Sequence, residues 1–236
     1  MTPHYRHALI VGAGSGLSAS LARLFTSKGL AVTLAARSVE KLSTLAAETG
    51  ASVHVCDAAD HAQVADLFRD ADSHEAGPPD VIVYNPSARV RGSFVEIDPH
   101  AVQQAVQITA VGAFFAAQEA AKRMVTTNHG AILFTGASAG VKGYPLSASF
   151  AMGKFALRGL AQSMARELHP LGVHIGHFVI DGGIRNPERP ERMDSSDNPD
   201  SMLCPDAIAR SYWHFLEQDR SSWAWEIELR PWVEKF

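Results

Sequence analysis

Short segments rich in apolar and β-branched residues alternate with longer segments of helical periodicity along almost the whole 236-residue chain. Such alternation is typical of stacked βαβ units, in which a helix connects each strand to the next parallel strand. We expect strands at residues 7–11, 31–35, 53–56, 80–84, 131–135, 174–179 and 225–229. We expect helices at residues 17–28, 39–49, 61–72, 99–124, 147–169 and 205–217. The sequence therefore predicts one α/β domain over residues 1–236, with a Rossmann-type doubly wound parallel sheet of about seven strands flanked by helices.

The composition excludes several classes of protein. Hydrophobic residues make up 46% of the chain and charged residues 19%, so a folded core is expected and a disordered chain is not. With 21 basic and 25 acidic side chains, the net charge of −4 favours neither nucleic acid nor an anionic membrane as a partner. No stretch approaches the ~20 apolar residues that a membrane-spanning helix needs.

Cysteine and histidine usage predicts a cytoplasmic protein without a metal site. Cys56 and Cys204 are too few for a disulfide framework or a zinc cage, and Cys56 ends a strand as a small hydrophobic residue would. None of the eleven histidines belongs to a recognisable metal-ligand motif. The apolar run at residues 8–13 is short and broken by glycine, unlike that of a signal peptide.

A glycine-rich turn joins the first expected strand to the first expected helix. Glycines in such a turn let a pyrophosphate approach the backbone and rest on free amides at the positive end of the helix. The expected contacts come from Gly12, Gly14, Ser15, Gly16 and Leu17. The alternative is a turn that needs glycine only for its backbone angles, but its place in the first βαβ unit favours nucleotide binding.

The end of the second expected strand indicates which nucleotide binds. Dinucleotide folds that prefer NAD usually carry an acidic residue there for the ribose 2′-hydroxyl. Here Ala36 is followed by Arg37 and Ser38, which offer a cation and a hydroxyl to a 2′-phosphate. We therefore expect NADP(H) in preference to NAD(H), with a solvated surface arginine as the alternative for Arg37.

Further landmarks follow in a fixed order: CDAAD at 56–60, DVIVYNP at 80–86, FAMGKFALRGLAQSMAREL at 150–168 and VIDGGI at 179–184. Together with the three residues between Gly12 and Gly16, they resemble the short-chain dehydrogenase/reductase family from residue 8 to residue 229. The resemblance implies further cofactor-binding residues, namely Asp57, Ala58, Asn85, Pro86, Ser87, Lys154, Gly182, Ile184 and Asn186.

Several of these positions depart from the family pattern. Ser18 stands where the glycine turn usually ends in a third glycine, and residues 85–87 read Asn-Pro-Ser where the family has Asn-Ala-Gly. Asp181 replaces the proline of the turn after the sixth strand. Asn186 takes the place of a threonine that holds the nicotinamide amide, a contact that asparagine can also make.

The catalytic positions depart further. The family tyrosine that protonates the substrate corresponds to Phe150, which has no hydroxyl. The family serine corresponds to Ala137 and the family asparagine to Thr109, so Lys154 alone remains of the usual set. The resemblance implies that Lys154 binds the ribose hydroxyls of the cofactor. The alternative for Lys154 is a helix lysine in a salt bridge.

Three nearby hydroxyls are candidates to replace the missing acid: Ser138, Ser149 and Tyr144. The two serines can instead satisfy backbone groups, and Tyr144 can be an ordinary loop aromatic. Two functions therefore stay open. One is a hydride-transfer enzyme with an impaired or unusual site, acting on an unknown small substrate. The other is a catalytically silent NADP(H)-binding sensor or scaffold protein.

Two further segments carry expectations. Residues 185–199 are polar and proline-rich and, with the residues up to 204, form a substrate loop or a plain surface excursion. The segment 223–236 concentrates aromatic residues and suits the homodimer or homotetramer contact that the family commonly makes. Alternatively, Trp223 and Trp225 only pack the last strand on its own core.

Overall fold

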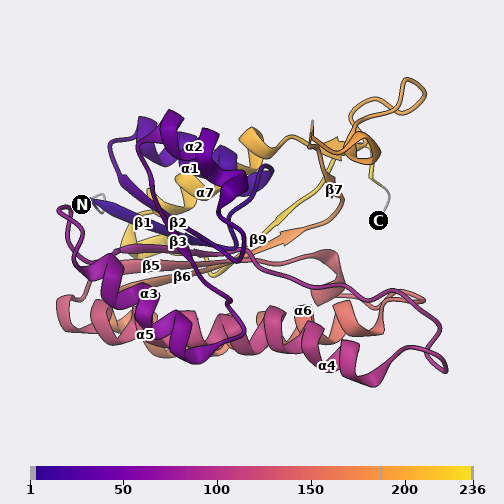
Figure 1. Cartoon of the computed structure of the whole chain (residues 1–236), viewed down its shortest axis with the longest axis horizontal. Helices are drawn as coiled ribbons and strands as arrows, with labels where there is room; N and C mark the ends of the chain where they lie inside the picture. The colour runs from indigo at the N-terminus through magenta and orange to yellow at the C-terminus, as the bar shows by residue number, and fades with distance from the viewer. Residues whose placement is uncertain (1–3, 187, 235–236) are drawn as a thin grey trace.

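The computed structural model describes residues 4–186 and 188–234. A seven-stranded parallel sheet runs through it in the order β3-β2-β1-β4-β5-β6-β9, which confirms the predicted Rossmann-type fold (Figure 1). The strands are β1 (His7–Val11), β2 (Ala31–Ala36), β3 (Ser52–Val55), β4 (Val81–Tyr84), β5 (Gly130–Thr135), β6 (Val173–Ile180) and β9 (Glu226–Leu229). Each lies within one or two residues of its predicted position.

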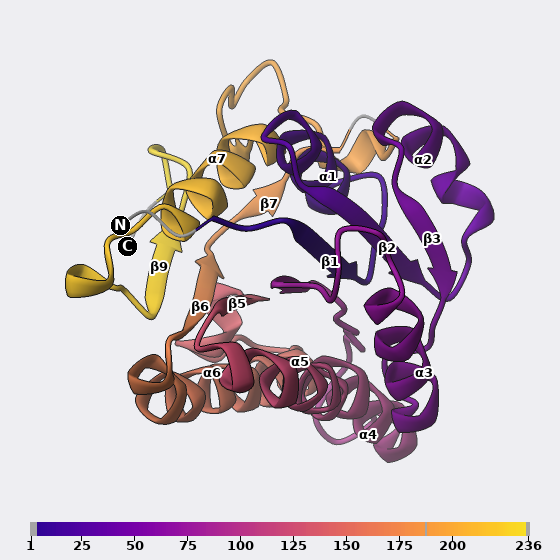
Figure 2. The same cartoon turned by 90° about the vertical axis from the view of Figure 1, so that its left-hand side faces the viewer.

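Helices cover both faces of this sheet. They are α1 (Leu17–Ser27), α2 (Ser43–Thr49), α3 (His61–Asp72), α4 (Pro99–Val106), α5 (Gly112–Thr127), α6 (Ala148–Leu168) and α7 (Pro205–Leu216). Helices α1, α2 and α7 lie on one face, and α3 to α6 lie on the other (Figure 2). Both faces of the strands are therefore buried, as expected for a parallel sheet.

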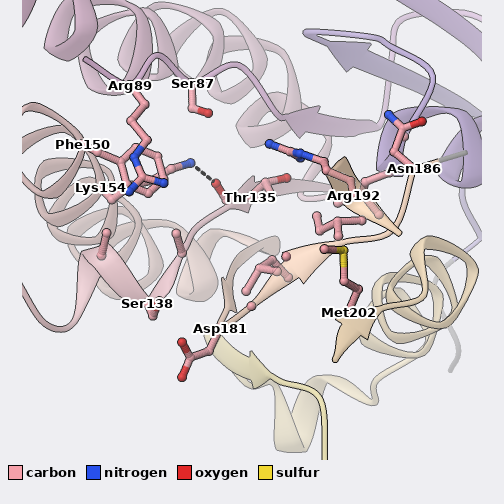
Figure 3. A pocket seen from close by; sticks show the side chains of 18 of the residues that line it. Ser87, Arg89, Thr135, Ser138, Phe150, Lys154, Asp181, Asn186, Arg192 and Met202 are labelled. Carbon is pink, nitrogen blue, oxygen red and sulfur yellow. Dashed lines mark hydrogen bonds between the residues drawn. The ribbon is translucent and has the colours of Figure 1, made fainter. Parts of the chain in front are cut away.

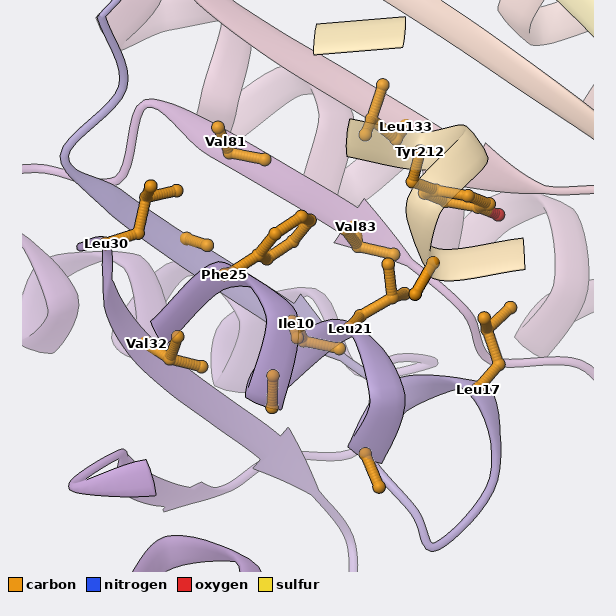
Figure 4. Packing of buried hydrophobic residues seen from close by; sticks show 14 of the residues in the cluster. Ile10, Leu17, Leu21, Phe25, Leu30, Val32, Val81, Val83, Leu133 and Tyr212 are labelled. Carbon is orange, nitrogen blue, oxygen red and sulfur yellow. The ribbon is translucent and has the colours of Figure 1, made fainter. Parts of the chain in front are cut away.

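Each face of the sheet has its own apolar core. On the side of α1 and α7, Phe25 and Leu21 pack against Ile10 and Val83 of the sheet, and Tyr212 of α7 joins them (Figure 4). On the other side, α5 and α6 contribute several alanines to a core that also contains larger residues such as Phe68 and Leu157. Small residues let these helices lie close to the strands that hold the site.

The helix predicted as continuous over residues 99–124 is interrupted. A π-helical turn spans Gln107–Val111 between α4 and α5, so the prediction was wrong in this respect. Such a turn leaves a backbone carbonyl without its usual partner, and the Tyr84 hydroxyl donates a hydrogen bond to the Ile108 carbonyl. A Cβ at Gly112 would lie 2.3 Å from the Ala58 carbonyl oxygen, so glycine permits the close approach of α5 to the segment after β3.

The sheet order reverses between β1 and β4, and such a reversal opens a crevice at the carboxyl ends of the strands. Beyond β6, a two-stranded parallel sheet pairs β7 (Gly183–Ile184) with β8 (Met202–Leu203) and closes the base of the segment between them. Among the described residues, no helix has the length and apolar character needed to cross a bilayer.

The aromatic residues near the C-terminus make contacts within the chain. The Trp223 ring stacks on His174 of β6, with 4.2 Å between ring centroids. Trp225 packs against the core and lies under the Arg158 guanidinium, 5.4 Å from it. These contacts favour the packing role for both rings. Residues 235 and 236 of this segment lie outside the described chain, and assembly of several copies stays a prediction.

Candidate functional site

A cleft of about 1000 Å³ opens at the carboxyl ends of the strands. Its walls are the glycine-rich turn, the loop after β4, the segment from the end of β5 into α6, and the segment after β6 (Figure 3). Of the predicted site residues, thirteen line it: Gly14, Ser15, Gly16, Leu17, Asn85, Ser87, Ala137, Ser138, Phe150, Lys154, Gly182, Ile184 and Asn186. The structure thus brings most of the predicted cofactor-binding residues and most of the predicted catalytic residues into one cavity.

The glycine-rich turn has the geometry of an anion site. Gly12 has φ +77°, and its amide donates to the Ala35 carbonyl at 2.9 Å, which folds the turn back over β2. A Cβ at Gly12 would lie 2.7 Å from Pro86, so both the backbone angle and this contact require glycine. Helix α1 begins after Gly16 without a side-chain cap or an acidic residue in its first turn. Its first amides therefore remain free for a phosphate.

The substituted residues of this turn hold one another in place. The buried Ser18 hydroxyl donates to the Gly12 carbonyl at 3.2 Å. The same oxygen accepts a hydrogen bond from the Asn85 side-chain amide at 2.8 Å. The serine in the third glycine position therefore ties the turn to the loop after β4.

Four predicted nucleotide contacts that follow β2 and β3 lie outside the cleft lining, as do Gly12 and Pro86. Arg37 and Ser38 are exposed just beyond the end of β2. Within the described chain the Arg37 guanidinium has no ion-pair or hydrogen-bond partner, so it is free to meet a ligand. Asp57 accepts the Ala59 amide at 3.0 Å, and Ala58 is buried against α5. All four nonetheless stand at the carboxyl ends of β2 and β3.

Pro86 and Asn186 have structural contacts of their own. Pro86 packs against the glycine turn at Gly12 and does not line the cleft. The Asn186 amide nitrogen lies 3.4 Å from the Ser15 hydroxyl, and its carbonyl oxygen accepts the Glu188 amide at 3.0 Å. Asn186 therefore links the segment after β6 to the glycine turn, and a nicotinamide would have to displace these contacts to use it.

Lys154 is a buried cation without a carboxylate partner. Its side chain is 3% exposed, and Nζ donates to the Thr135 carbonyl at 2.7 Å (Figure 3). Burial lowers the pKa of this ammonium from its ordinary value to about 7. Because no acidic group of the described chain pairs with it, the salt-bridge alternative was wrong. The lysine lines the cleft and can hydrogen-bond a ligand there.

The residues at the positions of the family's catalytic tyrosine, serine and asparagine are apolar or lie outside the cleft lining. Ala137 and Phe150 line it, and neither can donate or accept a proton. Thr109 is buried outside the lining, where its hydroxyl accepts the Ala88 amide at 3.1 Å. It also fills the space over Gly153, where a Cβ would come within 2.9 Å of it. Thr109 therefore supports the loop after β4 and does not face a substrate.

The replacement hydroxyls fall into two groups. Ser149 is fully buried, donates to the Val90 carbonyl at 2.7 Å and accepts the Val90 amide at 3.1 Å, so it holds a loop and lies outside the cleft lining. Ser138 and the half-exposed Tyr144 do line the cleft. Lys142 lies 5.6 Å from the Tyr144 ring centroid. Geometry thus leaves Ser138 and Tyr144 as the hydroxyls that a substrate could reach.

Asp181, in the proline position after β6, is buried in the cleft wall between two cations. Its carboxylate lies 3.6 Å from the Lys142 ammonium and 3.7 Å from the Arg230 guanidinium. The two cations compensate the charge of this buried carboxylate, so aspartate is accommodated where the family has an uncharged proline.

The comparisons with known proteins agree with this geometry. The family model described as short chain dehydrogenase matches residues 6–188. The chain belongs to the short-chain dehydrogenase family. It is 34% identical over 175 residues to (+)-borneol dehydrogenase 1 of Salvia officinalis, covering 70% of this chain and 65% of that protein. It is 32% identical over 170 residues to a cyclic-di-GMP-binding biofilm dispersal mediator protein of Escherichia coli, covering 71% and 68%.

The match to a 3-dehydrosphinganine reductase of Arabidopsis thaliana is 29% identical over 179 residues and spans about half of that relative, 53% of its length. Among solved structures, a short-chain dehydrogenase from Rhodopseudomonas palustris has a TM-score of 0.82 and 31% identity, covering 98% of this chain and 100% of that one. A metagenomic short-chain oxidoreductase in complex with NADP has the same fold, with a TM-score of 0.82, 24% identity and coverage of 97% and 98%.

Two arginines of the site were missed from the sequence. Arg89 and Arg91 follow β4 in the segment ARVRG and line the cleft. A signal was available, because basic residues just after a strand reach the same edge of a parallel sheet as the glycine turn.

Proposed function

We propose that this protein is an NADP(H)-binding oxidoreductase of the short-chain dehydrogenase type with an impaired active site. One observation carries the proposal: the glycine turn and Lys154 line the same cleft as Phe150 and Ala137. The cleft therefore combines the groups that suit a nucleotide with apolar side chains at the positions of the family's reacting hydroxyls. We expect slow turnover of simple ketones.

The residues present fit the cofactor. Free amides at the start of α1 and the open space beside Gly14 suit a pyrophosphate, because a Cβ at Gly14 would meet nothing within 4 Å. The buried Lys154 ammonium suits the ribose hydroxyls, and the unpartnered Arg37 suits a 2′-phosphate. When bound, the nicotinamide would supply or accept a hydride.

The chain's own contribution to the chemistry is limited to orientation and electrostatics. Lys154 holds a proton at Nζ below its pKa of about 7 and is then the one buried cationic donor at the Phe150 end of the cleft among the residues described. Ser138 and Tyr144 can hydrogen-bond a substrate oxygen from the same wall. A positioned acid typically contributes about 10²–10⁴-fold, so its loss slows carbonyl reduction without excluding hydride transfer.

The second candidate function is a catalytically silent NADP(H)-binding sensor or scaffold. Phe150 itself favours it, since a phenyl ring in the position of the proton donor leaves the nucleotide contacts untouched. The two candidates differ in whether NADPH is consumed when a substrate is present.

Titration of NADPH and NADH against the protein, followed by nucleotide fluorescence, tests the cofactor proposal. We expect tighter binding of NADPH than of NADH. Arg37→Gln should weaken NADPH binding about 10-fold and leave NADH binding unchanged, since it removes a charge-assisted contact to the 2′-phosphate. Arg166→Gln, an exposed arginine of α6 outside the cleft, is the matched control. Tighter binding of NADH would contradict the proposal.

We further propose that the protein assembles into a homodimer or homotetramer. Phe114 of α5 and Met152 and Phe155 of α6 support this, because these large apolar side chains are about half exposed on neighbouring helices. Light scattering coupled to size-exclusion chromatography measures the mass directly, and a monomer at micromolar concentration would contradict the proposal.

A further inference from the structure

The walls of the cleft carry a charge opposite to that of the chain. The net charge of the whole protein is −4. The cleft is lined by six cationic side chains, Arg89, Arg91, Lys154, Arg185, Arg189 and Arg192. It is lined by three acidic ones, Asp181, Glu191 and Glu234. Of these, Arg185 is already paired with Asp194, and Asp181 with Lys142 and Arg230. The excess of positive charge attracts anions into the site.

Arg89 concentrates this charge where a substrate would react. Its guanidinium carbon lies 5.3 Å from the centroid of the Phe150 ring, and the Lys154 ammonium lies 5.7 Å from the same centroid (Figure 3). Nη2 of Arg89 donates to the Ser147 hydroxyl at 3.1 Å. No carboxylate in the described parts of the chain pairs with Arg89 or Arg91, so the remaining donors of both guanidinium groups are available to a ligand.

The backbone that carries Arg89 is anchored to the start of α6. Val90 exchanges two hydrogen bonds with the buried Ser149 hydroxyl, at 3.1 and 2.7 Å. The Gly92 amide donates to the Leu146 carbonyl at 3.2 Å. With the bond from Arg89 to Ser147, these contacts fix the loop on both sides of the arginine. A ligand therefore meets an exposed arginine whose backbone is fixed and whose guanidinium is held by the bond to Ser147, which reduces the entropy lost on binding.

The phosphates of a nucleotide would not use this arginine. The pyrophosphate site is at the start of α1, and the proposed 2′-phosphate site is at Arg37 beyond β2. Arg89 belongs to the loop after β4 and stands beside Phe150, whereas Arg37 follows β2, which is separated from β4 by β1. Its charge thus remains for the second ligand.

We propose that the substrate carries an oxyanion group, a carboxylate or a phosphate, which Arg89 binds beside Phe150 while Arg91 adds positive charge. This inference rests on the proposed function. A guanidinium offers a planar pair of N–H donors that matches both oxyanions, and it remains protonated throughout the physiological range. Arg89 therefore selects and orients the substrate and does not replace the missing acid.

Binding of paired probes to the NADPH-loaded protein tests the proposal. The probes are benzoylformate, its neutral methyl ester, and phenyl phosphate, titrated by the change in NADPH fluorescence. We expect at least one anion to bind about 10-fold or more tightly than the ester, with an affinity that falls as salt is raised. The stronger of the two anions then identifies carboxylate or phosphate as the substrate group.

Variants locate the effect at Arg89. Arg89→Gln should remove the preference for the anion over the ester and leave NADPH affinity unchanged, and Arg91→Gln should reduce the preference less. Arg166→Gln should change neither quantity. Equal binding of anion and ester by the wild type, no measurable binding of either anion, or an unaltered preference in Arg89→Gln would overturn the proposal.

A calorimetric titration of the same anions without cofactor separates this inference from the proposed function. If NADPH fails to bind while the anion preference and its dependence on Arg89 persist, the proposed cofactor is wrong and the anion site stands. If NADPH binds and the Arg89→Gln substitution leaves the affinity for the anions unchanged, the anion site is wrong and the proposed cofactor stands.

Discussion

The nucleotide end and the reacting end of the cleft depart from the family pattern in different ways. At the nucleotide end, two of the unusual residues contact the rest of the site: Ser18 bonds to Gly12 and Asn85, and Pro86 packs on the glycine turn. At the reacting end, Ala137 and Phe150 have no polar group to offer, and the polar atoms around them belong to other residues. Under the proposed function, the first kind of change preserves a nucleotide-binding surface, whereas the second removes the family's proton donor.

The contacts that a substituted residue makes determine whether its departure from the family pattern affects structure, binding or chemistry. Thr109 also stands in the position of a family residue, yet its hydroxyl supports the Ala88 amide and its methyl group packs on Gly153. That substitution keeps a structural role and loses a catalytic one. Under the proposed function, the three substitutions at the reacting end leave a site that binds its ligands without the family's acid.

The largest effect is expected at the glycine turn. Gly12→Ala places a Cβ 2.7 Å from Pro86 at a φ of +77°, so it should lower the free energy of unfolding by more than about 2 kcal/mol and abolish measurable NADPH binding. Gly14→Ala, where a Cβ meets nothing within 4 Å, should leave stability unchanged. Denaturant unfolding and NADPH fluorescence measure both quantities. Unaltered NADPH affinity in Gly12→Ala would show that the turn does not hold the nucleotide.

Lys154→Met should move binding and stability in opposite directions. NADPH affinity should fall about 10-fold with the loss of the ammonium. The folded-state pKa of about 7 lies below the ordinary value of 10.5, so the buried ammonium destabilises the wild type fully below pH 7 and progressively less up to pH 10.5. The variant should therefore be more stable by about 2 kcal/mol at pH 6, after loss of the bond to Thr135 is counted, and the difference should shrink toward pH 10.

Urea unfolding of the Lys154→Met variant and the wild type at pH 6, 8 and 10 measures this trend. Lys41→Met, at an exposed lysine, is the matched control for the loss of a lysine side chain. A Lys154→Met variant that is less stable than the wild type at pH 6 would mean that the lysine has a charged partner in solution.

The smallest effect is expected at Ser18. Ser18→Ala breaks the bonds to the Gly12 carbonyl and the Asn85 amide, which should lower the free energy of unfolding by about 1–2 kcal/mol and NADPH affinity several-fold. Ser27→Ala, on the exposed side of the same helix, should change stability by less than about 0.5 kcal/mol. Equal thermal shifts for the two variants would contradict a link between the turn and the loop after β4.

The fold and most of the cleft could be predicted because their signals are local. Alternating apolar and helical segments predict the parallel sheet, and residues at the carboxyl ends of its strands necessarily meet at one edge. The π turn at residues 107–111 could not be predicted, because the apolar pattern continues through it and the hydroxyl that bonds to its Ile108 carbonyl belongs to Tyr84, 24 positions away.

Hydrogen bonds between residues that are distant in the sequence could not be predicted either. Ser18 and Asn85 are 67 positions apart, and nothing in either segment indicates that they bond. The burial of Lys154 without a carboxylate likewise depends on which side chains of other elements surround it. Arg89 carried a usable signal in its position just after a strand, and the family's motif positions do not include it.

The central claim is that the cleft binds NADPH and lacks the family's proton donor. Single-turnover oxidation of bound NADPH by benzoylformate and by a simple ketone, in the wild type and in the variant with Ala137→Ser and Phe150→Tyr together, tests it most directly. We predict wild-type rates barely above background, and an increase of about 10²–10⁴-fold in the double variant at unchanged NADPH affinity. Fast turnover by the wild type, or a double variant that binds NADPH and stays at background, would contradict the account.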